Sequence, residues 1–208
     1  SAHVRGDSHK YSGENVTYRV NGTKIFENLK VSLSESTGLR HPDLYVLHGG
    51  NPGSVYNGAF KAMLTTKPET SLTRELSFKY VLSDNISFGT TAYEGSVSDV
   101  LNRSSSKGGY NETIDIEQKG IENIFELQDG NQKLTLTNTL SKSREGNGRP
   151  QLRRPEKQYG VRYSKQLISS IIGPFSLNYD YRHIGKTEDW VGSFRKDTDS
   201  TDIMNLNL

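Results

Sequence analysis

The segment "PFSLNYDYRHIG", residues 174–185, sorts its side chains into two rows. Phe175, Leu177, Tyr179 and Tyr181 occupy the odd positions, and the even positions between them carry polar or charged side chains. A period of two residues is typical of a β-strand whose two faces meet different surroundings. The apolar row could face the core of a soluble sandwich, or it could face lipid on the outside of a membrane barrel.

The composition favours a sheet protein with only a thin apolar layer. Hydrophobic residues make up 32% of the 208 residues, below the roughly 45% of a soluble globular domain. The mean hydropathy of −0.71 agrees with this polarity. A disordered chain would also be polar, but the 11 Tyr and 7 Phe and the regular alternation argue against disorder.

Charge and residue usage exclude several classes of function. The formal net charge of +2 creates no field that would indicate nucleic acid as a partner. The absence of Cys removes disulfides, zinc–thiolate sites and cysteine nucleophiles. The five His are scattered, and no Asp-x-Asp-x-Asp-Gly run or serine nucleophile elbow occurs. We therefore expect no enzyme, no catalytic residue, no cofactor and no metal site.

Alternating runs recur along the chain and predict an all-β, antiparallel fold. No stretch of helical length carries an apolar stripe at the helical period. Many runs have about 10 to 13 residues, which matches the roughly 9–11 that cross a bilayer at a tilt. Strands are predicted near residues 14–20, 24–36, 70–80, 85–96, 112–127, 133–142, 156–166, 174–184 and 201–208, with a stub at 1–4.

Short and long connections alternate between these strands. The short ones are "NGT" at 21–23, "SDN" at 83–85, "DGN" at 129–131 and "LISSIIG" at 167–173. The long ones cover residues 37–69, 97–111, 143–155 and 185–200. This order predicts an up-and-down transmembrane β-barrel with short periplasmic turns and long extracellular loops. The apolar rows would then face lipid, and charged residues would line an aqueous lumen, among them Glu75, Lys79, Asp180 and Arg182.

Five segments, taken in order, resemble successive pieces of TonB-dependent outer-membrane receptors, most closely the cobalamin- and siderophore-receptor branch. They are "SESTGLRHPDLYVLHGGNP" (34–52), "KPETS" (67–71), "AYEGSVSDVL" (92–101), "KGIE" (119–122) and "QLRRPEKQYGVRY" (151–163). The resemblance implies a receptor in the outer membrane, surrounded by lipid and lipopolysaccharide. It also implies TonB-energised uptake of a scarce nutrient such as an iron-siderophore, haem or cobalamin.

The resemblance is partial in two respects. Such receptors begin with a TonB-contacting motif and a plug domain and end with two further strands, and the sequence shows none of these. We therefore expect residues 1–208 to be an internal fragment with about ten of the 22 strands of such a barrel, so that TonB would act through the absent plug domain. The insertion "GSVYNGAFKAMLTT" also separates two elements that usually adjoin in the family.

The long loops carry aromatic, His and Arg side chains, which suit stacking and anion recognition of a small-molecule chelate. An alternative for each residue is a place in the interfacial aromatic girdle, or pairing with lipopolysaccharide or a nearby carboxylate. The candidate ligand-binding residues are Arg40, His41, Tyr45, His48, Tyr56, Arg153, Arg154 and Trp190.

Two other classes of protein remain as alternatives. A secreted soluble all-β module could recognise sugars or surfaces through the long loops, and its apolar row 175–181 would be buried against a second sheet. A passive porin-like barrel would lack the "GLRHPDL" and "KGIE" segments, so the sequence argues against it.

Overall fold

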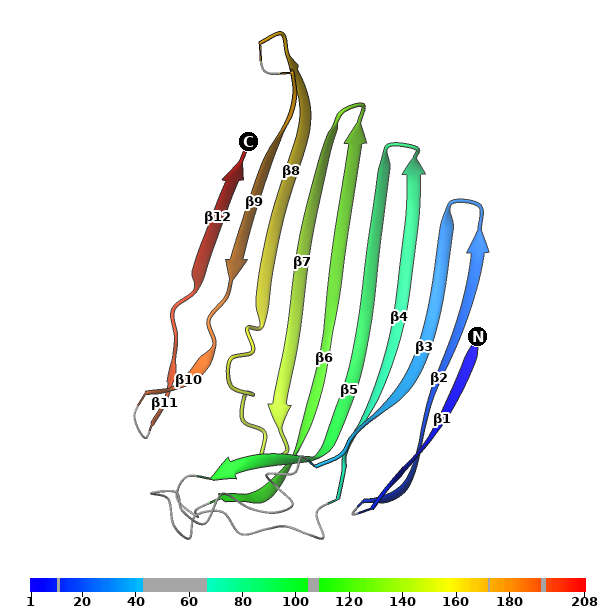
Figure 1. Ribbon diagram of the computed structural model, residues 1–208, viewed down its shortest axis with the longest axis vertical. Coiled ribbons are helices and arrows are strands. Elements are labelled where there is room, and N and C mark those ends of the chain that lie inside the picture. The colour runs from blue at the N-terminus through cyan, green and yellow to red at the C-terminus, as the bar shows by residue number, and fades with distance from the viewer. Residues whose placement is uncertain (11, 43–66, 105–108, 172, 192–193) are drawn as a thin grey trace.

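The computed structural model describes residues 1–10, 12–42, 67–104, 109–171, 173–191 and 194–208, in which every regular element is a strand (Figure 1). For residues 101–104 and 109–113 the description is limited to the backbone. The strands are β1 (Ala2–His9), β2 (Gly13–Phe26), β3 (Leu29–Arg40), β4 (Glu69–Ser83), β5 (Ile86–Ser104), β6 (Gly109–Asp129), β7 (Gln132–Glu145), β8 (Lys157–Ser169), β9 (Gly173–Ile184), β10 (Glu188–Val191), β11 (Phe194–Asp197) and β12 (Thr201–Asn207).

Ten of these strands form one antiparallel sheet in the order β1-β2-β3-β4-β5-β6-β7-β8-β9-β12. Each strand of this sheet pairs with the strand that follows it in the chain, apart from the β10–β11 hairpin inserted between β9 and β12. Neighbour-to-neighbour connection is the topology of an up-and-down barrel. The predicted all-β antiparallel meander of about ten strands is therefore confirmed.

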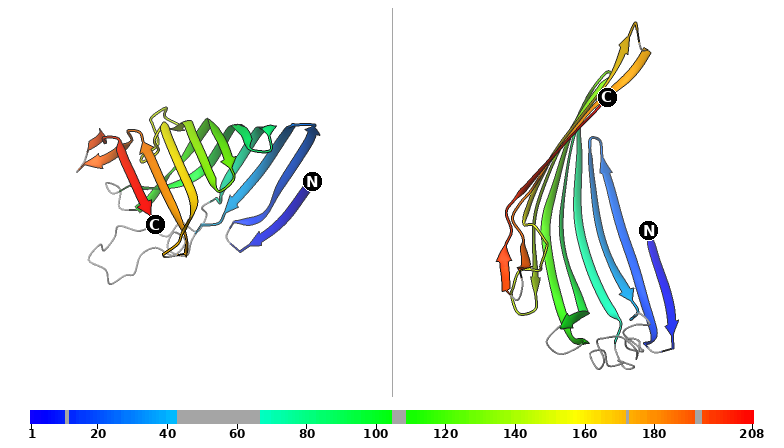
Figure 2. Two further views of the ribbon diagram at one scale, coloured as in Figure 1. Left: turned by 90° about the horizontal axis from the view of Figure 1, so that it is seen from above. Right: turned by 60° about the vertical axis from the view of Figure 1, so that its left-hand side comes forward.

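The sheet is a single layer. Both views in Figure 2 show a twisted wall with no second sheet packed on it. In the described part of the chain, the buried hydrophobic core consists of Ile116 alone, while Val4 and Met204 are 75% and 66% exposed. A soluble sandwich requires two layers around one core. The row Phe175 to Tyr181 is accordingly not covered by a second sheet, which removes the expected feature of the soluble alternative.

The register of the strands separates an apolar face from a polar face. Because side chains alternate along every strand, residues that are opposite one another lie on the same face. On the polar face, one row runs Thr23, Ser32, Ser77, Thr91, Glu122, Thr139 and Gln158. On the apolar face, one row runs Phe26, Leu29, Tyr80, Phe88, Phe125, Leu136, Val161, Tyr181 and Met204.

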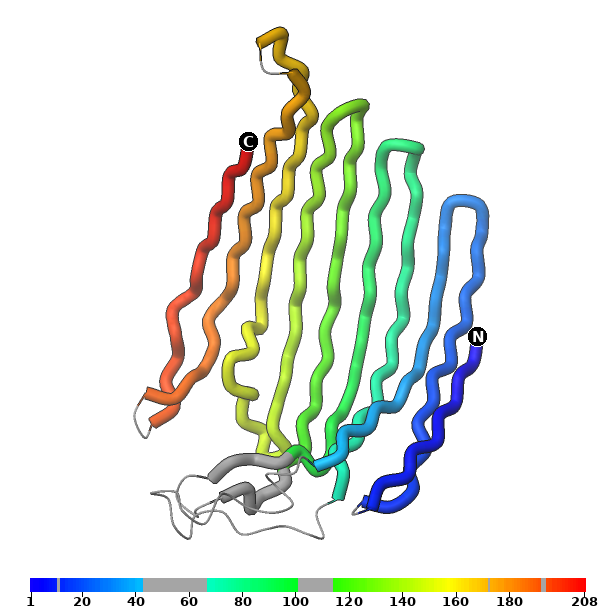
Figure 3. Tube along the Cα trace, in the orientation of Figure 1, coloured from blue at the N-terminus to red at the C-terminus, as the bar shows by residue number. Residues whose placement is uncertain are grey.

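The connections divide the sheet into a turn end and a loop end (Figure 3). At the turn end, the strands of the ten-stranded sheet are joined by residues 27–28, 84–85, 130–131 and 170–172. Gly130 has a φ of 54°, as expected in a two-residue hairpin turn. At the loop end, the joins are residues 10–12, 41–68, 105–108, 146–156 and 185–200. The predicted turns at 83–85 and 129–131 are confirmed. The join predicted at 167–173 is shorter, because β8 continues to Ser169 and β9 begins at Gly173.

The predicted turn at residues 21–23 is wrong. Asn21 is opposite Ser34 inside the β2–β3 ladder, and the hairpin turns at Glu27 and Asn28 instead. Glu27 adopts a φ of 37° there. "NGT" has the composition of a turn, but the longer ladder lets Phe26 join the apolar row opposite Leu29. The two-faced pattern and the pairing register of the whole strand thus prevail over local turn chemistry.

Three other predictions need correction at the loop end. The loop predicted at 97–111 is mostly strand, because β5 and β6 continue to a join at 105–108. Their ladder is interrupted by a register shift between Val97 and Val100, where Asp99 has a φ of 58°, as in a β-bulge. The stub at 1–4 extends to the eight residues of β1. The loop at 185–200 contains the β10–β11 hairpin.

Candidate functional site

The predicted ligand-binding residues that the structure describes lie at the loop end of the sheet. They are Arg40, His41, Arg153, Arg154 and Trp190. Tyr45, His48 and Tyr56 lie outside the described residues. The five described residues form two groups, one at the end of β3 and one between β7 and β11.

Arg40 and His41 form the first group, where β3 ends. Arg40 is opposite Glu69 in the β3–β4 ladder, and its Nη1 lies 3.3 Å from Glu69 Oε2. The His41 ring stacks on the His9 ring with the centroids 4.4 Å apart. Ser12 Oγ lies 2.7 Å from His41 Nδ1 and 2.9 Å from His9 Nδ1. The β1–β2 connection therefore positions His41, a contact that sequence reasoning did not detect.

Arg153 and Trp190 belong to the second group, which we name the Arg195 cluster. Its members come from the end of β7, the 146–156 connection and the β10–β11 hairpin (Figure 1). They are Glu145, Arg153, Glu188, Asp189, Trp190 and Arg195.

Arg195 is the centre of this cluster. Its Nη2 lies 2.5 Å from Glu145 Oε1, and its Nη1 donates to the Pro150 carbonyl at 3.0 Å and lies 3.7 Å from Glu188 Oε2. The same guanidinium lies 5.6 Å from the centroid of the Trp190 ring, within range of a cation–π contact. Only 18% of the Arg195 side chain and 10% of the Glu145 side chain are exposed, so water screens this pair weakly.

Arg153 is held at the edge of the Arg195 cluster. Its Nε lies 3.0 Å from both carboxylate oxygens of Asp189, and its backbone N–H donates to the Glu188 carbonyl at 2.9 Å. The hydrogen bond from Arg153 is the main cause that lowers the pKa of Asp189, and the Trp190 backbone N–H adds to it. The φ of 60° at Arg153 marks a left-handed backbone that these contacts maintain.

The Arg195 cluster shows which cations remain available to a ligand. Arg153 and Arg195 are engaged with carboxylates. Arg154, which follows Arg153 in the chain, is exposed, and no ion pair joins it to another residue in the described ranges. Sequence reasoning missed Glu145, Glu188 and Asp189. The signal that could have found them is that two successive predicted loops carry opposite charges, which can form ion pairs between the loops.

The two groups lie well apart along the wall. The end of β3 and the start of β8 are five strand spacings apart in the sheet, or about 24 Å at about 4.8 Å per strand. The structure therefore brings Arg153 and Trp190 together but does not bring them to Arg40 and His41. In the described part of the chain, no group of three His, Cys, Asp or Glu side chains could hold a metal ion.

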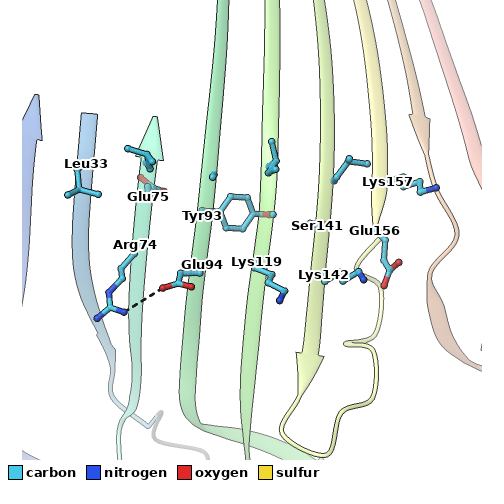
Figure 4. Close-up of a pocket in the computed structure, with 15 residues that line it drawn as sticks. Leu33, Arg74, Glu75, Tyr93, Glu94, Lys119, Ser141, Lys142, Glu156 and Lys157 are labelled. Carbon is cyan, nitrogen blue, oxygen red and sulfur yellow. Dashed lines mark ion pairs between the residues drawn. The ribbon is translucent and has the colours of Figure 1, made fainter. Parts of the chain in front are cut away.

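A shallow hollow of about 680 Å³ lies on the sheet over β3 to β8 (Figure 4). Where it crosses β6, the Tyr93 hydroxyl lies so close to Gly120 that a Cβ on Gly120 would be 2.7 Å from it. A side chain at position 120 would displace Tyr93, which explains the glycine. Charged residues also line the hollow, among them Arg74, Glu94 and Lys119.

The described structure is a single-layer wall with one apolar face and one polar face, which is the construction of a transmembrane β-barrel. No described helix is long and apolar enough to cross a membrane. Residues 1–208 match the family model described as "TonB dependent receptor-like, beta-barrel". The chain thus belongs to the TonB-dependent receptor β-barrel family, whose members are outer-membrane transporters and not enzymes.

Solved structures of receptors and transporters share this fold. The siderophore receptor PirA from Acinetobacter baumannii is similar with a TM-score of 0.75 and 15% identity, over 98% of this chain and 36% of that chain. For the ferripyoverdine receptor of Pseudomonas aeruginosa the TM-score is 0.69 and the identity is 13%, over 93% of this chain and 27% of that chain. For the FrpB iron transporter from Neisseria meningitidis the TM-score is 0.67 and the identity is 14%, over 93% of this chain and 32% of that chain. This chain therefore spans about a third of their length. No curated protein matches the sequence.

Proposed function

We propose that this chain is part of the barrel wall of a longer receptor, which takes up a scarce nutrient as a bulky chelate with energy from TonB. An iron-siderophore, haem or cobalamin is the expected cargo. The match of the whole chain to the receptor-barrel family carries this proposal. The two-faced wall supports it, because the polar face can line a passage and the apolar face can meet lipid.

The remaining parts of the receptor are also proposed. Within the described sheet, β1 and β12 each pair on one side only. Unpaired strand edges are not tolerated in hydrocarbon, because their N–H and C=O groups find no partner there. We infer that further strands of the same receptor pair with β1 and β12, and that a plug domain outside residues 1–208 contacts TonB.

The loop end is the proposed place of ligand capture. Arg154 is an exposed cation without an ion-pair partner in the described ranges, and it directly follows Arg153 in the chain. A free guanidinium can form two parallel hydrogen bonds to a carboxylate or hydroxamate-type oxygen pair of a chelate. Arg153 contributes by positioning the loop through Asp189. Arg40 and His41, at the end of β3, are further proposed ligand contacts. Tyr45, His48 and Tyr56 are proposed from the sequence alone and lie outside the described residues.

Uptake by cells that carry the intact receptor tests this function. Radiolabelled ferric siderophores, haem and cobalamin are supplied in turn to cells with and without TonB. We expect one class of chelate to accumulate only when both the receptor and TonB are present. Arg154→Ala should raise the concentration for half-maximal uptake by roughly tenfold, because it removes a charge-assisted contact. Lys133→Ala, at the turn end, should change it little. Uptake of no chelate, or uptake without TonB, would contradict the proposal.

A further inference from the structure

The apolar face carries one row of charged residues where it approaches the loop end. Across β3 to β7, directly opposite one another, stand Glu35, Arg74, Glu94, Lys119 and Lys142. The next row toward the turn end is Leu33, Leu76, Ala92, Ile121 and Leu140, followed by Lys157 on β8. The charged row therefore borders the apolar rows on the same face of the wall.

The two halves of this row differ in how their charges are compensated. Arg74 Nε lies 2.6 Å from Glu35 Oε2, and Arg74 Nη1 lies 3.5 Å from Glu94 Oε1, the contact dashed in Figure 4. Lys119 and Lys142 are exposed, and no carboxylate within the described ranges forms an ion pair with either. Over β3 to β5 the row thus carries two carboxylates and one guanidinium, all joined in ion pairs, whereas over β6 and β7 it carries two ammonium groups without an ion pair.

The nearby carboxylates already face other cations. Glu94, opposite Lys119, is the partner of Arg74. Glu156 lies 2.8 Å from Arg144 Nη2. Glu117 stands one row nearer the loops and is opposite Arg144. Within the described ranges, neither lysine therefore has an ion-pair partner of its own.

Two like charges directly opposite in an antiparallel pair destabilise the sheet unless an anion lies between them. Lys157 lies diagonally across from Lys142, because it is opposite Leu140, and it adds a third ammonium group (Figure 4). The ligand that suits this place has phosphate groups at the level of the lysines and acyl chains that cover Ile121 and Leu140. On the outer side of an outer membrane, the lipid with that chemistry is lipopolysaccharide.

We propose that Lys119, Lys142 and Lys157 form a binding site for the phosphates of one lipopolysaccharide molecule on the outside of the barrel wall. This site rests on the outer-membrane orientation proposed above, with the loop end outside the cell. It is separate from the ligand-binding loops, since it lies on the apolar face. Two observations carry the inference: the positive charge of the three lysines is complementary to phosphate, and the adjoining rows on the same face are apolar.

The test uses the intact receptor, purified in detergent and stripped of lipid. Binding of diphosphorylated lipid A is compared with binding of the same lipid A after enzymatic removal of its phosphates, and with phosphatidylglycerol. Each lysine near a membrane surface raises the affinity for anionic lipid about fivefold. The double variant Lys119→Gln with Lys142→Gln should therefore weaken the binding of diphosphorylated lipid A roughly thirtyfold. Lys119→Arg with Lys142→Arg should retain most of the affinity.

The matched control is Lys24→Gln with Lys165→Gln, two lysines on the same face at the turn end. It should leave lipid A binding unchanged, and gel mobility before and after heating should confirm that every variant is folded. Equal affinity of the wild type for dephosphorylated lipid A or phosphatidylglycerol, or an equal loss in the control, would overturn the site. Chelate uptake is measured separately, in cells that carry the same receptor. Its failure in the wild type would remove the transport function but leave a lipid A difference intact.

Discussion

The wall of the sheet and the Arg195 cluster are stabilised in opposite ways. In the wall, strand ladders satisfy the backbone, and large side chains such as Leu136 remain exposed on the apolar face. In the cluster, charged hydrogen bonds join segments that share only short ladders, and Arg195 and Glu145 are largely buried. The wall therefore depends on its surrounding solvent being lipid, whereas the cluster depends on its own side chains. A change that damages one should leave the other intact.

The largest effect is expected from a charge on the apolar face of the wall. Leu136→Arg places a guanidinium in the middle of the long apolar row on β7 and should destabilise the barrel in lipid vesicles by about 2–4 kcal/mol. Thr139→Arg puts the same side chain on the polar face of the same strand, opposite Glu122, and should change the free energy of unfolding by less than about 0.5 kcal/mol.

Urea titration of the intact receptor in vesicles measures both variants. A loss of stability for Thr139→Arg as large as that for Leu136→Arg would mean that the two faces do not differ in solvent. The Arg195 cluster should keep its resistance to protease in both variants, because neither residue contacts it.

A smaller and local effect is expected from the cluster. Arg195→Ala leaves Glu145 without its close cationic partner in a largely buried position, which costs roughly 2–3 kcal/mol of local stability. Cleavage by trypsin near the β10–β11 hairpin should increase, while the urea midpoint of the wall stays within error. Arg149→Ala, which removes an exposed arginine of the neighbouring loop, is the control. Unfolding of the whole wall in Arg195→Ala would show that the cluster is not an independent unit.

The difference between the two regions also explains what could be predicted from the sequence. The wall follows from a period of two residues, which is local and appears in almost every segment, as in Phe175 to Tyr181. Strand order followed from the short turns at 83–85 and 129–131. The misplaced turn at 21–23 shows the limit, because turn composition at Asn21 was outweighed by register across β2 and β3.

The Arg195 cluster could not be predicted in this way. Arg195 and Glu145 are 50 residues apart, and nothing local in either segment reports their pairing. His41 was a candidate, but its stacking on His9 depends on the β1–β2 connection, which no periodicity indicates. Trp190 was predicted as a ligand contact from its residue type, and its position over Arg195 gives it a structural partner as well. Its contact with a ligand stays a prediction.

The smallest effect is a loosening of the cluster by acid. The pKa of Asp189 is lowered by the hydrogen bond from Arg153, so this carboxylate stabilises the folded loop above its ordinary pKa of about 3.9. The contribution is lost as the pH falls through the lower, folded pKa. Hydrogen exchange across residues 186–200, corrected for its intrinsic pH dependence, should therefore be constant from pH 7 to pH 5 and rise only in strong acid. Asp189→Asn should abolish this acid-dependent rise in hydrogen exchange, and the loop should exchange faster at every pH. An unchanged acid step in Asp189→Asn would assign the transition to another group, and the wall, which carries no such dependence on Asp189, should exchange at the same rate in both proteins.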